Sequence, residues 1–161
     1  MSAKIGRMYR LLERRYGDLG WWPADTPFEV VVGAVLTQNT SWRNVEKAMA
    51  QLKRARLMDP ASICRAKISR LSKAVRPAGY YRIKAARLKE VSSFLLAECG
   101  GDLLRLKRAP AAALRDKLLS VKGVGPETAD SILLYALDNP VFVVDAYTRR
   151  IFERHGLISV R

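Results

Sequence analysis

The chain has 161 residues, and its 29 Lys and Arg residues against 15 Asp and Glu residues give a net charge of +14. A chain of this length can bury one core, or one core with a smaller lobe built from the two ends, which excludes two large independent domains. The charge indicates a polyanionic partner. Nucleic acid is favoured over a membrane, because the longest apolar run, residues 30–36, falls far short of the roughly 20 residues that span a bilayer.

The sequence contains only two cysteines, Cys64 and Cys99, and they are far apart. A disulfide framework, a zinc site and an iron–sulfur cluster are therefore not expected, because such metal sites need about four clustered ligands. The N-terminal residues carry charge but no apolar segment, so no secretory signal is expected. We predict a protein of a reducing, cytoplasmic compartment that binds no metal and no cofactor.

Apolar residues recur at helical spacing along most of the chain, and no segment alternates convincingly with period two, so the predicted fold class is all-α. A first helix is indicated by five such residues: Ile5, Met8, Leu11, Leu12 and Tyr16. The next helix is expected to follow Thr26 as N-cap, with Pro27 at its first position and Glu29 completing a capping box. It carries the apolar run 30–36 and is expected in the middle of the core.

The middle of the chain is predicted to contain several helices with a cationic surface. Ser41 is expected to cap a helix with one apolar face, formed by Trp42, Val45, Met49 and Leu52. A short helix is expected to open at Asp59 and Pro60, and residues 76–79 break the chain after another. A long helix follows and ends at Gly100, with these residues in phase: Lys84, Leu88, Val91 and Leu95. Residues 43–90 hold 14 Lys and Arg residues against three acidic residues, which places most of the phosphate-attracting surface here.

The last third of the chain is predicted to contain shorter elements. Residues 103–106 and 110–119 are two helical pieces, and a further helix is expected to begin at Pro126. Residues 141–144 are β-branched or aromatic and are expected to be extended. Asp145 is then the predicted N-cap of the last helix.

Two glycines one residue apart, Gly123 and Gly125, lie between two of these helical segments. Glycine permits a positive φ and a close backbone approach, so the backbone N–H groups are expected to point outward together and, with Lys122, to seat a phosphate. The alternative is an ordinary glycine turn with a solvated lysine. The cationic chain favours DNA-backbone binding, which supplies position and not sequence specificity. The predicted binding residues here are Lys122, Gly123, Val124, Gly125 and Thr128.

From the hairpin to Asp145, the chain resembles the endonuclease III-like helix-hairpin-helix (HhH-GPD) DNA glycosylases, and by that match Asp145 is the catalytic carboxylate. Residues 36–40 match the family segment whose glutamine enters the DNA stack, so Gln38 is expected to fill the space left by an extruded nucleotide. The resemblance implies a six-helix barrel domain over residues 23–134, with the helix-hairpin-helix at 118–134. It also implies a second helical lobe formed by residues 1–22 and 135–161, which is expected to be truncated because relatives continue for several more helices.

Bifunctional relatives carry a lysine two residues after the second hairpin glycine, where it forms a Schiff base with the deoxyribose; this chain has Glu127 there. The resemblance therefore favours a monofunctional enzyme. Residues 21–23, 36–40 and 75–81 resemble the bacterial 3-methyladenine DNA glycosylase group, in which the positions of Trp21, Trp22 and Trp42 line the base pocket. We assign Glu127 to the same pocket.

These matches imply an enzyme that flips a damaged base, such as an alkylated purine, out of duplex DNA and hydrolyses its N-glycosidic bond. A carboxylate at Asp145 would stabilise the positive charge that develops on the sugar. By residue type alone, Asp145 is an N-cap, Glu127 a first-turn glutamate and Trp42 a core residue. A bifunctional glycosylase/AP lyase and a non-catalytic DNA-binding module are the alternatives. The expected partner is damaged double-stranded DNA, bound by a monomer in a bacterial or archaeal nucleoid.

Overall fold

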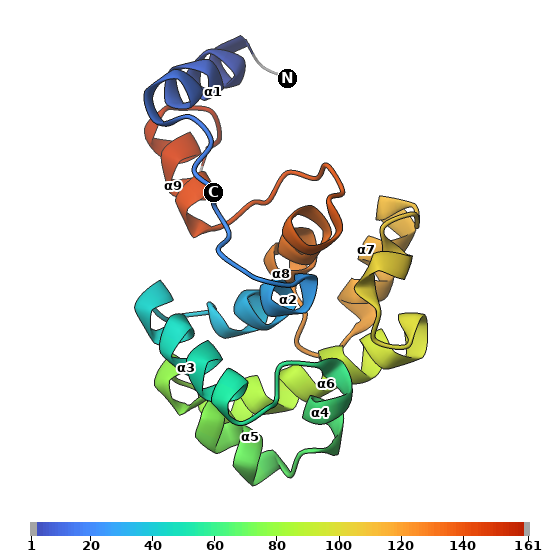
Figure 1. Cartoon of the computed structure of the whole chain (residues 1–161). Helices are drawn as coiled ribbons and strands as arrows, with labels where there is room; N and C mark the ends of the chain where they lie inside the picture. Colours follow the sequence, from blue (N-terminus) through green and yellow to red (C-terminus); the bar gives the residue numbers. More distant parts are fainter. Residues whose placement is uncertain (1–2, 160–161) are drawn as a thin grey trace.

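The computed structural model describes residues 3–159, and every regular element in that range is helical, which confirms the predicted all-α class (Figure 1). The elements are α1 (Ala3–Tyr16), α2 (Pro27–Leu36), α3 (Trp42–Arg54), α4 (Pro60–Arg65), α5 (Ile68–Ala74), η1 (Arg76–Ala78), α6 (Tyr81–Cys99), η2 (Leu103–Leu106), α7 (Ala111–Ser120), α8 (Pro126–Ser131), the π-helix η3 (Ile132–Ala136) and α9 (Ala146–Arg154). Residues 141–144 belong to no regular element and connect η3 to α9.

Helix α2 is the centre of the core, as its apolar sequence predicts, because every residue from 28 to 36 is buried. Its start differs in one detail from the predicted capping box. Thr26 Oγ1 accepts a hydrogen bond from the Glu29 N–H, but the Glu29 carboxylate accepts from the N–H of Asp25 instead of from that of Thr26. The same carboxylate pairs with Lys53 of α3 at 2.8 Å, and this partner compensates its burial.

The other helices of residues 27–137 pack around α2. The expected face of α3 is buried at Val45, Met49 and Leu52, while Trp42 lies at the edge of the core. Helix α6 contributes buried residues along its length, and η3 packs against α2. Each fully buried Val, Leu or Ile stabilises the fold by about 1.5–3 kcal/mol, so this core accounts for most of the hydrophobic stabilisation.

Lys84 is an unusual member of that core, because its side chain is only 2% exposed. Its ammonium group donates hydrogen bonds to the carbonyl oxygens of Leu36, at 2.9 Å, and Ala78, at 2.6 Å. Burial, and then the charge of nearby Arg87, lower the pKa of Lys84. The predicted helical phase of Lys84 is confirmed, and its two bonds tie the end of α2 to the chain break before α6.

Helices α1 and α9 lie side by side, away from the helices that surround α2 (Figure 1). The ammonium group of Lys4 donates a hydrogen bond to the carbonyl of His155, and the rings of Phe142 and Phe152 stack 6.2 Å apart. Within the described range, Gly6 is the one buried residue of α1, and α9 has none. We call α1, α9 and residues 141–145 the terminal lobe. No helix in residues 3–159 is long and apolar enough to cross a membrane.

Candidate active site

The hairpin between α7 and α8 is a tight turn in which the N–H of Val124 donates to the carbonyl of Val121 at 3.0 Å. Gly123 has φ +90°, and a Cβ built on it would lie 2.5 Å from Cγ of Arg87. Only glycine satisfies both constraints. Gly125 has φ −96°, and its Cβ direction is open for 4 Å. The first glycine therefore shapes the turn, and the second leaves the surface accessible to a ligand.

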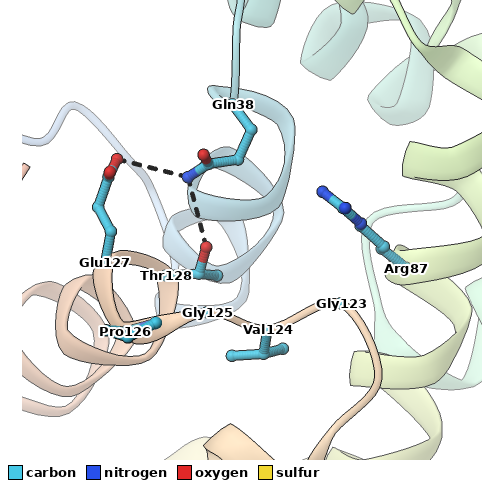
Figure 2. Close-up of a pocket in the computed structure, with 8 residues that line it drawn as sticks. All are labelled: Gln38, Arg87, Gly123, Val124, Gly125, Pro126, Glu127 and Thr128. Carbon is cyan, nitrogen blue, oxygen red and sulfur yellow. Dashed lines mark hydrogen bonds between the residues drawn. The ribbon is translucent and has the colours of Figure 1, made fainter. Parts of the chain in front are cut away.

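A cavity of about 460 Å³ lies in front of the hairpin (Figure 2). Residues 123–128 form one wall, while Gln38 approaches from the turn after α2 and Arg87 from α6. The Gln38 amide donates to Glu127 Oε1 and to Thr128 Oγ1, each at 3.4 Å. Hydrogen bonds of that length are weak, so Gln38 can leave this position at little cost.

The structure thus brings together most residues that were assigned to DNA binding: Gln38, Gly123, Val124, Gly125 and Thr128. Lys122 is exposed beside them but does not line the cavity. Arg87 was not predicted from the sequence. It lies in the cationic middle segment, yet nothing in the local pattern distinguishes it from its neighbours, because the contact with Gly123 spans 36 positions.

A second, smaller cavity of about 100 Å³ adjoins the first and contains Asn39 and Tyr80. Both residues adopt left-handed backbone conformations, with φ of +53° and +43°. Such conformations are uncommon outside glycine and concentrate at functional sites. Tyr80 is 67% exposed, and it follows Gly79, whose φ is +69°. The paired tyrosines at 80 and 81 are candidates for the pocket rim by residue type, and the exposure of Tyr80 beside this cavity fits that interpretation.

An aromatic cluster of Trp22, Trp42 and Tyr135 packs beside Gly33 of α2. The Trp22 ring is 5.6 Å from Trp42 in an edge-on arrangement and 5.1 Å from Tyr135 in a tilted stack. A Cβ at Gly33 would lie 3.0 Å from the indole ring of Trp22. The absence of a side chain at Gly33 therefore allows the ring to pack directly against α2. Trp21, by contrast, is 68% exposed, and no contact with another aromatic ring is found for it among the described residues.

Tyr135 was not predicted as part of the pocket. It belongs to the π-helix η3, in which one extra residue per turn changes the direction of the side chains relative to an α-helix. Helical periodicity in the sequence does not reveal such a change. Burial, and then the Asp145 carboxylate, raise the pKa of the Tyr135 hydroxyl, so the hydroxyl keeps its proton at neutral pH.

Asp145 is the N-cap of α9, as its position in the sequence predicts. Its Oδ1 accepts a hydrogen bond from the N–H of Thr148 at 2.7 Å. In the described part of the chain, no hydrogen bond to its second oxygen is found. Because the carboxylate acts on the pKa of Tyr135, the cap residue is near enough to the aromatic cluster to interact with it electrostatically. The site therefore combines aromatic rings with a half-buried carboxylate.

The two cysteines add no group to this site. Cys64 is partly buried, Cys99 is buried, and both are free thiols. Residues 3–159 contain no group of three His, Cys, Asp or Glu side chains placed to hold a metal ion.

Comparisons with known proteins connect this geometry to a family. Residues 32–161 match the model of the HhH-GPD superfamily base excision DNA repair proteins. The chain is 50% identical over 156 residues to a protein of Methanocaldococcus jannaschii designated as a DNA repair glycosylase, with 96% of this chain and 71% of that protein covered. It is 33% identical to endonuclease III of Thermotoga maritima, with 84% of this chain and 59% of the relative covered.

Solved structures show the same similarity. The Helicobacter pylori 3-methyladenine DNA glycosylase bound to 1,N6-ethenoadenine superposes with a TM-score of 0.81 at 34% identity, covering 98% of this chain and 73% of that one. An endonuclease III–DNA complex superposes with a TM-score of 0.83 at 22% identity, with 99% of this chain and 71% of that one covered, and it supports the fold alone. The chain belongs to the HhH-GPD superfamily of base excision DNA repair proteins.

Proposed function

We propose that this chain is a DNA N-glycosylase that flips an alkylated purine out of duplex DNA and hydrolyses its N-glycosidic bond without AP-lyase chemistry. The observation that carries the proposal is the aromatic cluster of Trp22, Trp42 and Tyr135, with the carboxylate of Asp145 in electrostatic range of the Tyr135 hydroxyl. Aromatic rings suit the stacking of a flipped base, and a carboxylate suits the charge on its sugar.

The hairpin supplies the attachment to DNA in this proposal. Its open glycine, Gly125, allows a phosphate to approach the backbone closely, and the chain as a whole has the charge for such a contact. Gln38 is held near the hairpin by two long hydrogen bonds. When DNA binds, Gln38 leaves these bonds and fills the space that the flipped nucleotide vacates.

The pocket selects an alkylated purine through its rings. An N-alkylated purine carries a positive charge, and the electron-rich faces of Trp22 and Trp42 attract it by about 0.5–2 kcal/mol for each well-placed ring. The similarity to a 3-methyladenine DNA glycosylase crystallised with an ethenoadenine supports this substrate class. Trp21 is exposed and precedes Trp22 directly in the chain, and we keep it as a residue of the pocket rim in this proposal.

Asp145 carries the hydrolysis. As the glycosidic bond breaks, its electron pair stays with the base, and positive charge develops on the sugar. The Asp145 carboxylate stabilises that charge and orients the water whose oxygen attacks the sugar carbon. The start of a helix favours an ionised cap, so capping and catalysis are compatible. The alkylated base is already a good leaving group and needs little help from an acid.

Glu127 argues against lyase chemistry. It occupies the position at which bifunctional relatives have their Schiff-base lysine, and its carboxylate accepts a hydrogen bond from Gln38. A carboxylate cannot form an imine with the sugar. We place Glu127 at the mouth of the base pocket, and we propose that the enzyme works as a monomer, in the nucleoid, without a metal ion or cofactor.

The test is a base-release assay with duplexes that carry an alkylated purine, an oxidised purine or a mismatch. Free alkylated purine, detected by chromatography and unaffected by EDTA, is the expected product. DNA binding without release of any base would instead identify a non-catalytic binding module. Borohydride treatment with abasic DNA tests the lyase alternative, and a covalent protein–DNA adduct would contradict the monofunctional assignment.

A further inference from the structure

We propose that Arg87 and the hairpin residues 123–125 together form a binding site for one DNA phosphodiester, with the Arg87 guanidinium as its cation. The proposal rests on the DNA-binding part of the proposed function and is independent of base excision. The sequence had predicted that Lys122 is the cationic residue of this phosphate-binding site, so the proposal replaces Lys122 by Arg87.

The position of Arg87 is fixed by the hairpin. Helix α6 presents its side chain to the turn, and the aliphatic part lies where a Cβ of Gly123 would otherwise be, with Cγ at 2.5 Å and Cδ at 3.0 Å from that point. The guanidinium extends past the turn into the cavity, on the side of Gln38 (Figure 2). Because the aliphatic part of Arg87 packs against Gly123, its guanidinium loses less side-chain entropy on binding than the ammonium group of an exposed residue such as Lys122.

The charge of Arg87 is not neutralised within residues 3–159. The ion pairs found there involve other cations: Lys53, Arg105, Lys107, Arg115 and Lys117. The nearest acidic residue that lines the cavity, Glu127, accepts its hydrogen bond from Gln38. The pKa of Lys84, one turn earlier on α6, is lowered in part by the charge of Arg87. A cation at the cavity without a carboxylate partner favours an anionic ligand.

The hairpin forms the opposite wall with suitable groups. Gly125 has open space on its Cβ side. In the described part of the chain, no hydrogen bond from the backbone N–H groups of Gly123 and Gly125 is found. A phosphodiester between the two walls could accept from these N–H groups and from the guanidinium, whose planar fork matches two phosphate oxygens. The volume of about 460 Å³ accommodates one backbone unit.

The experiment measures the affinity for an undamaged duplex as a function of salt concentration. Arg87→Met keeps an unbranched stem over Gly123 and removes the charge. We expect it to bind roughly tenfold more weakly at low salt. We also expect the slope of log affinity against log salt to become shallower by about one, since one phosphate contact is lost. The matched control, Arg108→Met, removes an exposed charge next to the other end of α7, about 15 Å away along that ten-residue helix, and should change the slope less.

Arg87→Lys protects the test against a folding defect, because it restores the charge without the fork. Its salt slope should return to the wild-type value, with affinity between those of the wild type and Arg87→Met. A wild-type slope in Arg87→Met would overturn the proposal, and so would an equal change of slope in Arg108→Met, because the effect would then reflect net charge and not this site. If the wild-type protein released no base but Arg87→Met still changed the salt slope, the proposed enzyme activity would be rejected and the phosphate-binding site would be retained.

Discussion

Helix α2 and helix α9 both contribute to the proposed site, but they are held in the molecule in different ways. Residues 28–36 of α2 are all buried, whereas no residue of α9 is. The aromatic walls therefore rest on a rigid core, while Asp145 stands at the start of a helix that is held by its cap and by contacts at the surface. The comparison suggests that recognition and stability belong to the core around α2, and that the chemistry depends on how the terminal lobe is positioned.

The largest effect is expected from Asp145→Asn, which separates chemistry from stability in the terminal lobe. Asparagine caps a helix about as well as aspartate, so the melting temperature should stay unchanged. Base release should fall by about a hundredfold to a thousandfold, the usual cost of removing one electrostatic group from a transition state. Single-turnover release and calorimetry on the same sample measure both. Unchanged release would remove Asp145 from its assigned role.

Truncation of one leucine in each region tests the difference in stability. Leu133, which is fully buried in η3, should lose about 2–5 kcal/mol of unfolding free energy when it is replaced by alanine. Leu12 of α1 is 54% exposed, and the same replacement should cost less than about 0.5 kcal/mol. Urea unfolding measures the two values. Equal losses would mean that the terminal lobe is as tightly packed as the core.

Gly33→Ala should show that the core also positions the pocket. Alanine raises the helix propensity of α2 by about 0.5–1 kcal/mol, but its Cβ would press on the Trp22 ring at 3.0 Å. We expect the ring to move, with a shift in tryptophan fluorescence and several-fold weaker binding of an alkylated base. In a Trp22→Leu background, the same glycine replacement should be neutral or stabilising. If Gly33→Ala stabilised the otherwise wild-type protein and left its fluorescence unchanged, the Trp22 ring would not be in tight contact with residue 33.

The smallest effect concerns the connection between the two regions. Hydrogen bonding from Lys53, and then its charge, lower the pKa of Asp25, which lies just before α2. The resulting stabilisation is complete above the ordinary pKa of about 3.8 and is lost as the pH falls through the lowered value. The stability difference between the wild type and Lys53→Met should therefore shrink between neutral pH and about pH 3. A difference that is constant with pH would show that the pair contributes nothing through Asp25.

The sequence predicted the helices well, because their signals are local. The Thr26 cap with Pro27, the Asp59 cap with Pro60 and the glycine end of α6 all appear where the residue types place them. The carboxylate of Glu29 was assigned to the right helix start but to the wrong N–H group. That detail depends on the path of the chain before the helix, which residue type alone does not specify.

The sequence by itself determined the all-α class, the hairpin between two helices, the capping role of Asp145 and, through its resemblance, the family. Only the tertiary structure decided which distant residues complete the site. Arg87 reaches the hairpin because Gly123 has no side chain, Tyr135 joins Trp22 because a π-helix redirects it, and Lys84 is buried because two carbonyls meet at its ammonium group. These contacts join residues far apart in the chain, and periodicity and capping patterns report only on neighbours within about two helical turns.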